Sequence, residues 1–142
     1  MGVFLDSNIL LKYLSGDRLA QRIVEENKGY VNTVVVSEVV YGYIRAVTGL
    51  SPFDLKKKFD KVDVDLEPVK ILLENFVEVP VPPFRSVLSI IDRYRLLPND
   101  AAIVASMQAA GLDTLATFDS DFVRVDWIKL VPKAYWLKQN IE

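Results

Sequence analysis

Short apolar runs alternate along the chain with longer segments in which apolar residues recur every three or four positions. The short runs are typical of buried strands, and the longer segments of helices that bury one face. The expected strands span residues 3–5, 30–32, 77–79, 114–117 and 128–131. The expected helices span residues 7–14, 17–27, 33–46, 52–61, 66–74, 83–94 and 98–111, with a helical turn at 119–123. Thr33 is expected to cap the third helix, and Gly29 to end the second.

Strands that alternate with helices predict a parallel sheet covered by helices on both faces. We therefore expect an α/β fold, a three-layer α/β/α arrangement around a central parallel sheet of about five strands, of the Rossmann-like kind. A chain of 142 residues has the length of one domain, and we expect a single domain over residues 1–142. The stretch at about 50–75 is expected to form a helical elaboration inside it.

Composition removes several chemistries from consideration. The sequence contains no cysteine and no histidine, which excludes disulfides, thiolate zinc sites and nucleophiles or bases of those two types. The net charge of −2 gives no overall basic signal for nucleic-acid binding. A local basic patch could still bind a nucleic acid in a protein of this net charge. The N-terminus has no signal-peptide pattern, and no apolar run approaches the ~20 residues of a membrane span. We expect a cytoplasmic protein with no membrane partner.

Four acidic residues stand where strands end or helices begin. Asp6 and Asp119 each follow an apolar run, Asp100 opens an alanine-rich helical segment, and Glu38 lies in a valine-rich one. Because the functional crevice of a parallel sheet lies beyond the carboxyl ends of its strands, we expect these acids to meet at one edge. Grouped carboxylates raise one another's pKa values, and carboxylate-only ligands favour Mg²⁺ or Mn²⁺. The pattern predicts a metal site that activates water for phosphodiester hydrolysis.

Three of these acids have a structural alternative as helix caps. Asp6 could equally be an N-cap, although the two polar residues after it could cap in its place. Asn99 beside Asp100 and Ser120 beside Asp119 are also suitable caps, which leaves the acids free for another role.

Glu38 has a different alternative. Its neighbours one turn away are mostly apolar, and an unpaired carboxylate on such a core-like face is costly. A buried ion pair with Arg45, two turns along the helix, would explain it structurally. Metal ligation fits better, because Gly42 is expected to leave open space on the same face.

Four motifs in order resemble the PIN domain family. They are the segments VFLDSNIL at 3–10, SE at 37–38 within a valine-rich helix, LPNDAAIVA at 97–105 and LATFDSDF at 115–122. The likeness is greatest to the small single-domain toxins of the VapC type, known from prokaryotic toxin–antitoxin pairs. It implies a parallel sheet between helices and cleavage of RNA that depends on Mg²⁺ or Mn²⁺.

The resemblance also assigns roles to residues. The catalytic and metal-binding quartet that it implies is Asp6, Glu38, Asp100 and Asp119. A more variable acid of the family matches Asp121, a secondary candidate for the metal, and its polar support positions match Asn8 and Thr117. Family members of this kind commonly form homodimers and are held inactive by a small antitoxin, so both partners are implied here.

An RNA substrate needs cations near the acids to hold its phosphates. The better candidates are Lys12 and Arg45, because each shares a helix with a motif residue. The other candidates are Arg85, Arg93, Arg95, Arg124 and the lysine run at 56–58. Two alternative functions stay open: an RNA-processing nuclease of this fold outside toxin–antitoxin systems, and a catalytically silent RNA-binding or scaffold domain. An aspartyl-phosphate phosphatase is disfavoured, because its second acid is replaced by Asn8.

Overall fold

A single parallel sheet organises the computed structural model, which describes residues 2–139. Its strands are β1 (Gly2–Leu5), β2 (Lys28–Val31), β3 (Val77–Glu78), β4 (Thr114–Ala116) and β5 (Lys129–Val131). The order across the sheet is β3-β2-β1-β4-β5, and every pairing is parallel. In the central strand Phe4 pairs with Tyr30 on one side and with Leu115 on the other. The predicted fold class is confirmed.

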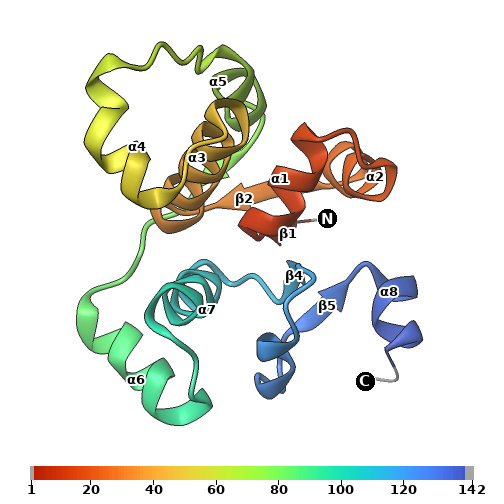
Figure 1. Cartoon of the computed structure of the whole chain (residues 1–142). Coiled ribbons are helices and arrows are strands. Elements are labelled where there is room, and N and C mark those ends of the chain that lie inside the picture. Colours follow the sequence, from red (N-terminus) through yellow and green to blue (C-terminus); the bar gives the residue numbers. More distant parts are fainter. Residues whose placement is uncertain (1, 140–142) are drawn as a thin grey trace.

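Helices cover both sides of this sheet. Their bounds are α1 (Ser7–Leu14), α2 (Arg18–Glu26), α3 (Thr33–Thr48), α4 (Pro52–Lys58), α5 (Glu67–Leu73), α6 (Phe84–Tyr94), α7 (Pro98–Ala110) and α8 (Lys133–Lys138). Two short 3₁₀ segments complete the order, η1 (Phe59–Lys61) and η2 (Ser120–Arg124). Figure 1 shows α1 and α2 to one side of the sheet and α6 and α7 to the other, which gives the three layers.

The central strands and α7 form the middle of the core. Phe4, Leu5 and Leu115 have no exposed surface, because β1 and β4 are covered on both faces. Every residue of α7 from Ala101 to Met107 is buried. The small side chains at the start of this helix allow it to lie close to its neighbours on all sides. The start of α7 is therefore held in one place relative to the sheet.

Several helix ends have local capping contacts or left-handed glycines. Asp17 caps α2 by accepting a hydrogen bond from the backbone N–H of Ala20, and Ser51 caps α4 by accepting one from Asp54. Helices α3 and α7 end at Gly49 and Gly111, whose φ angles of 68° and 71° are in the left-handed region. Glycine adopts this region without the steric cost that a Cβ would impose.

Other local expectations were wrong. Helix α2 ends at Glu26, and Gly29 lies inside β2, where an added Cβ would come within 2.6 Å of side-chain atoms of Leu5 and Phe76. The glycine is needed for this close approach and not as a helix stop. Helix α8 was not predicted; it begins directly after Pro132 and buries Trp136.

The cap of α3 is Asn32, and the expectation of Thr33 was wrong. Asn32 is fully buried, and its side-chain oxygen accepts from the N–H of Val35 at 3.0 Å. Its amide nitrogen donates to the carbonyl of Ala102 at 3.3 Å and to the hydroxyl of Ser106 at 3.0 Å. One side chain therefore begins α3 and joins the end of β2 to α7.

Among residues 2–139, no single helix is long and apolar enough to cross a membrane. The segments Thr33–Thr48 and Pro52–Lys61 pass that test only when taken together, by length and composition, and they are bent by 89°.

Replacement of Asn32 by alanine should lower the free energy of unfolding by about 2–4 kcal/mol. The loss combines a helix cap, worth about 1 kcal/mol, with buried hydrogen-bond partners left unpaired. Ser51→Ala is the matched control, because it removes an N-cap that is exposed, and it should cost only about 0.5–1 kcal/mol. Urea denaturation measures both. Equal losses in the two variants would contradict the linking role of Asn32.

Candidate functional site

Two of the acids follow neighbouring strands and so lie at the same edge of the sheet. Asp6 follows β1, and Asp119 comes three residues after the end of β4. The backbone N–H of Asp6 donates to the carbonyl of Ala116 at 3.0 Å, so the two chain segments leave the sheet side by side. Asp100 lies in the first turn of α7, and Glu38 in the second turn of α3. The four acids therefore stand after strands or in the first two turns of helices, as expected from the sequence.

The tightest group of acids is Asp100, Asp119 and Asp121. One carboxylate oxygen from each lies within 4.8 Å of the other two. All three side chains are partly exposed, so the group is open to solvent. Asp6 and Glu38 do not join the group at that distance. The acid that the resemblance marked as secondary, Asp121, thus belongs to the group that meets this distance criterion.

Asp6 is the most buried of the acids, with 4% of its surface exposed. Its Oδ1 accepts a hydrogen bond from the backbone N–H of Ser7 at 2.8 Å, and the residue is the N-cap of α1. Its Oδ2 accepts from the hydroxyl of Thr117 at 2.7 Å and from the amide of Asn8 at 3.4 Å. The cap alternative is therefore correct for Asp6, but it leaves the carboxylate beside the other acids.

The two polar support residues join β1 to the segment after β4. The hydroxyl of Thr117 accepts from the N–H of Asp119 at 3.0 Å while it donates to Asp6. The side-chain oxygen of Asn8 accepts from the N–H of Phe118 at 3.3 Å. These contacts fix the position of the Asp119 turn relative to Asp6.

Glu38 is only partly buried, so the argument that it is a carboxylate on a core-like face does not hold. Its Oε2 accepts from the amide of Asn99 at 3.2 Å. Within residues 2–139 there is no ion pair between Glu38 and Arg45, whose side chain is exposed. The expected open space at Gly42 is absent, because Leu11 of α1 comes within 2.7 Å of where a Cβ would stand. Gly42 serves the packing of α1 on α3.

The expected substitute caps are not used. Leu97 is the N-cap residue of α7 and makes no side-chain capping bond, while the Asn99 amide is directed to Glu38 instead. Asp119 itself caps η2, by accepting from the N–H of Asp121 at 2.9 Å, so Ser120 is not the cap. The contact between Asn99 and Glu38 was missed from the sequence, where 60 intervening residues separate the pair.

Burial and the surrounding acids raise the pKa of Asp100 from 3.8 to about 7. Loss of hydration is the largest cause, and the charges of Asp6, Asp119, Glu38 and Asp121 add to it in that order. Both effects disfavour the ionised form. The structure thus bears out the predicted upward shift for this acid.

Asp6 behaves in the same direction. Burial raises its pKa to about 6, although the hydrogen bonds from Thr117 and from the Ser7 N–H oppose the shift. The charges of Glu38 and Asp119 raise it further. Asp6 and Asp100 are thus both affected by charges on segments remote in the sequence.

The donor set fits a hard divalent cation. It consists of carboxylate oxygens only, which are the ligands that Mg²⁺ and Mn²⁺ prefer. The set contains no softer nitrogen or sulfur ligand. Asp100, Asp119 and Asp121 would hold the ion, because their oxygens already lie within 4.8 Å of one another. A cation there would remove the repulsion that raises the pKa of Asp100.

Among the candidate cations, Lys12 lies over the ring of a residue that precedes one of the acids in sequence. Its Nζ lies 5.5 Å from the ring centroid of Phe118, the residue before Asp119. Arg45 is about 10 Å further along α3 than Glu38, from a rise of about 1.5 Å per residue. Arg124 contacts Asp121 directly, at 3.3 Å between Nη2 and Oδ1.

The raised pKa values make a prediction about stability in the absence of metal. A folded-state pKa above the unfolded value of 3.8 means that the folded protein keeps a proton that the unfolded chain has lost. The free energy of unfolding should therefore fall as the pH rises from about 4 to about 7. Asp100→Asn should make this fall shallower. Urea denaturation in EDTA across this pH range measures the slope, and identical slopes would contradict the electrostatic origin.

Comparisons with known proteins agree with this geometry. The PIN domain family model matches residues 3–128. The chain is 34% identical over 137 residues to Ribonuclease VapC2 of Methanocaldococcus jannaschii, covering 91% of this chain and 92% of that protein. It is 30% identical over 151 residues to Ribonuclease VapC6 of the same organism, covering 91% and 95%.

Solved structures share the fold. PAE2754 from Pyrobaculum aerophilum aligns with a TM-score of 0.65 at 16% identity, covering 99% of each chain. A toxin–antitoxin complex from Klebsiella pneumoniae gives 0.61 at 20% identity, covering 89% of this chain and 95% of that one. VapBC2 from Rickettsia felis, bound to a DNA fragment from its promoter, gives 0.62 at 16%, covering 92% and 98%. On the family match and the two relatives at 30% identity or more, this chain belongs to the PIN domain family.

Proposed function

We propose that the chain is an endoribonuclease that hydrolyses RNA phosphodiester bonds with Mg²⁺ or Mn²⁺ as cofactor. The observation that carries this proposal is the approach of Asp100, Asp119 and Asp121 within 4.8 Å. Like charges held this close repel one another, and a bound divalent cation relieves that repulsion. Two relatives named as ribonucleases, VapC2 and VapC6, support the choice of RNA as substrate.

The catalytic residues in this proposal are Asp6, Glu38, Asp100 and Asp119, with Asp121 as a further ligand. A bound metal ion would supply an activated water and would neutralise charge on the phosphate. Neighbouring polar residues of the chain hold the catalytic carboxylates in position. Thr117 and Asn8 keep Asp6 in one orientation through hydrogen bonds to its Oδ2. Asn99 does the same for Glu38.

The substrate carries negative charge into an acidic region, so nearby cations are needed to hold it. Lys12 suits this role, because it is exposed and lies over the face of Phe118 beside Asp119. Phe118 is partly buried, and an unpaired base that stacks on its ring would compete with Lys12 for the same face. Arg45 would contact a phosphate further from the acids.

We infer that the biological role is that of a toxin controlled by a small antitoxin, with the chain as a homodimer. The names of the two relatives and of two structural neighbours support a toxin–antitoxin pair. An apolar groove between α3 and α4, lined in part by Tyr41, Ile44, Leu55 and Phe59, supports a protein partner. A cytoplasmic location is part of the same proposal.

Metal should stabilise the folded protein and permit cleavage. Mn²⁺ at about 100 times its dissociation constant should add about 2.7 kcal/mol to the free energy of unfolding and raise the melting temperature accordingly. Cleavage of a single-stranded RNA should require the metal, and Asp100→Asn should reduce the rate by at least about 100-fold with the fold retained. Asp92→Asn, an exposed acid on α6, is the matched control and should cleave as the wild type does.

Each alternative gives a different result in these assays. Equal cleavage in excess EDTA would contradict the metal mechanism, and full activity of Asp6→Asn or Glu38→Gln would contradict the residue assignment. RNA binding without cleavage at any metal concentration would indicate a silent scaffold. Cleavage that no co-expressed small protein inhibits would favour an RNA-processing nuclease outside toxin–antitoxin systems.

A further inference from the structure

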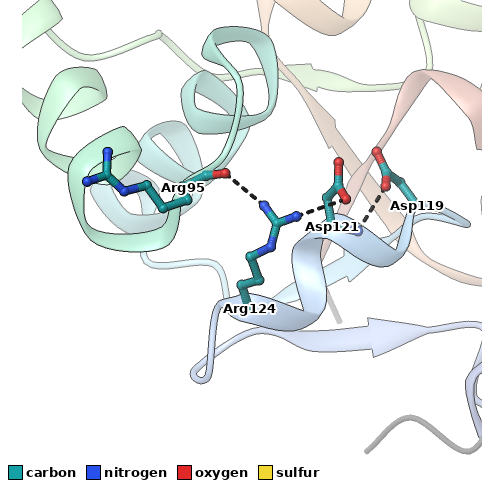
Figure 2. A network of polar contacts seen from close by, with 4 residues as sticks. All are labelled: Arg95, Asp119, Asp121 and Arg124. Carbon is teal, nitrogen blue, oxygen red and sulfur yellow. Dashed lines mark hydrogen bonds and ion pairs between the residues drawn. The ribbon is translucent and has the colours of Figure 1, made fainter.

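Arg124 joins the two chain segments that carry the closest acids. Its Nη2 contacts the Oδ1 of Asp121 at 3.3 Å, and its Nη1 donates to the backbone carbonyl of Arg95 at 2.7 Å (Figure 2). Asp121 belongs to the η2 turn, which begins after Asp119. Arg95 lies in the loop between α6 and α7, five residues before Asp100. One side chain therefore spans from the turn with two acids to the loop that leads to the third.

The backbone of Arg95 is held in an uncommon conformation at this contact. Its φ of 57° is the one positive value at a non-glycine position in the described part of the chain. For such a residue the left-handed region costs roughly 1–2 kcal/mol. Arg95 is the C-cap residue of α6, so its own carbonyl lies beyond the helical hydrogen bonds and is free to accept from Arg124.

The ion pair between Arg124 and Asp121 contributes little stability by itself. The side chains of Arg124 and Asp121 are 49% and 46% exposed, and ion pairs at such positions contribute only about 0–1 kcal/mol. The chain has a simple exposed pair for comparison, Arg22 with Glu26, at 3.7 Å within α2. That pair joins two residues of one helix and touches no group of acids. Arg124 differs because its second contact reaches another loop.

We propose that Arg124 is a positioning residue of the acidic site. It fixes the Asp121 carboxylate and the separation between η2 and the start of α7, so that Asp100, Asp119 and Asp121 are arranged for one divalent cation before the cation arrives. This inference rests on the proposed function. Figure 2 shows the carboxylates of Asp119 and Asp121 directed to the same side of the turn. Arg124 contacts one oxygen of Asp121, Oδ1, at 3.3 Å.

Two effects of Arg124 on metal affinity oppose each other. Its positive charge repels a cation, whereas its two contacts preorganise the ligands. Solvent screens the repulsion, because the guanidinium is half exposed. Groups that orient metal ligands are typically worth about 10–100-fold in affinity or activity. We therefore expect positioning to dominate, with a net effect near the lower end of that range.

The direct test is Mn²⁺ binding by isothermal titration calorimetry with the metal-stripped full chain. Arg124→Ala should weaken binding by about tenfold. Arg124→Lys should weaken it by at least about threefold, because one ammonium group keeps the charge but cannot reproduce the two-point contact of a planar guanidinium. Arg22→Ala is the matched control and should bind Mn²⁺ as the wild type does. The melting temperatures of all three variants in EDTA show whether the fold is retained.

A double-mutant cycle identifies the route by which Arg124 acts. In an Asp121→Asn background, Arg124→Ala should change the Mn²⁺ dissociation constant by less than about twofold, because its partner is already altered. An undiminished effect there would overturn the proposal. Equal or tighter Mn²⁺ binding by Arg124→Ala in the wild-type background would also overturn it.

The result separates this inference from the function on which it rests. If the wild type binds no Mn²⁺, the proposed function and the positioning role both fail. If the wild type binds Mn²⁺ and cleaves RNA but the Arg124 variants bind equally well, only the positioning role fails. If Arg124→Ala does not fold, Arg124→Lys keeps the charge and most of the side-chain length and decides the question alone.

Discussion

Repulsion among carboxylates at the carboxyl edge of the sheet is the constraint on which the rest of this structure depends. Asp6 and Asp100 are both harder to ionise than free aspartate, because they lose hydration and face the other acids. The fold resists this repulsion with directed contacts. Thr117 and the Ser7 N–H stabilise Asp6, Asn99 contacts Glu38, and Arg124 contacts Asp121. A proton or a divalent cation relieves the same repulsion, so acid titration and metal binding are linked at this site.

The sequence was sufficient for the parts of the fold that local pattern controls. Alternation of short apolar runs with helical segments indicated five parallel strands, and the structure has five. The expected meeting of the acids followed from one rule, that parallel strands end at a common edge. Asp6 and Asp119 obey it directly, because β1 and β4 are neighbours in the sheet. The start of α7 could be located from Pro98, which is favourable in the first turn of a helix.

Contacts between segments remote in sequence could not be predicted in the same way. Asn32 caps α3 in place of the expected Thr33. Its side-chain amide also reaches α7, a contact that no local sequence pattern reveals. The role of Gly29 depends on Phe76, 47 residues away. Asp121 ranked below the quartet by resemblance, although its distance to Asp100 and Asp119 puts it in the closest group. The contact from Arg124 to the Arg95 carbonyl involves a backbone atom and so leaves no side-chain signal at residue 95.

The central claim is that carboxylates from remote segments form one cation site. A crystal structure of the chain grown with Mn²⁺, with anomalous diffraction data collected near the manganese edge, tests it most directly. We expect a strong anomalous peak in direct contact with oxygens of Asp100, Asp119 and Asp121. A well-ordered site with water alone between these side chains at saturating Mn²⁺, or a peak only at unrelated surface acids, would contradict the account.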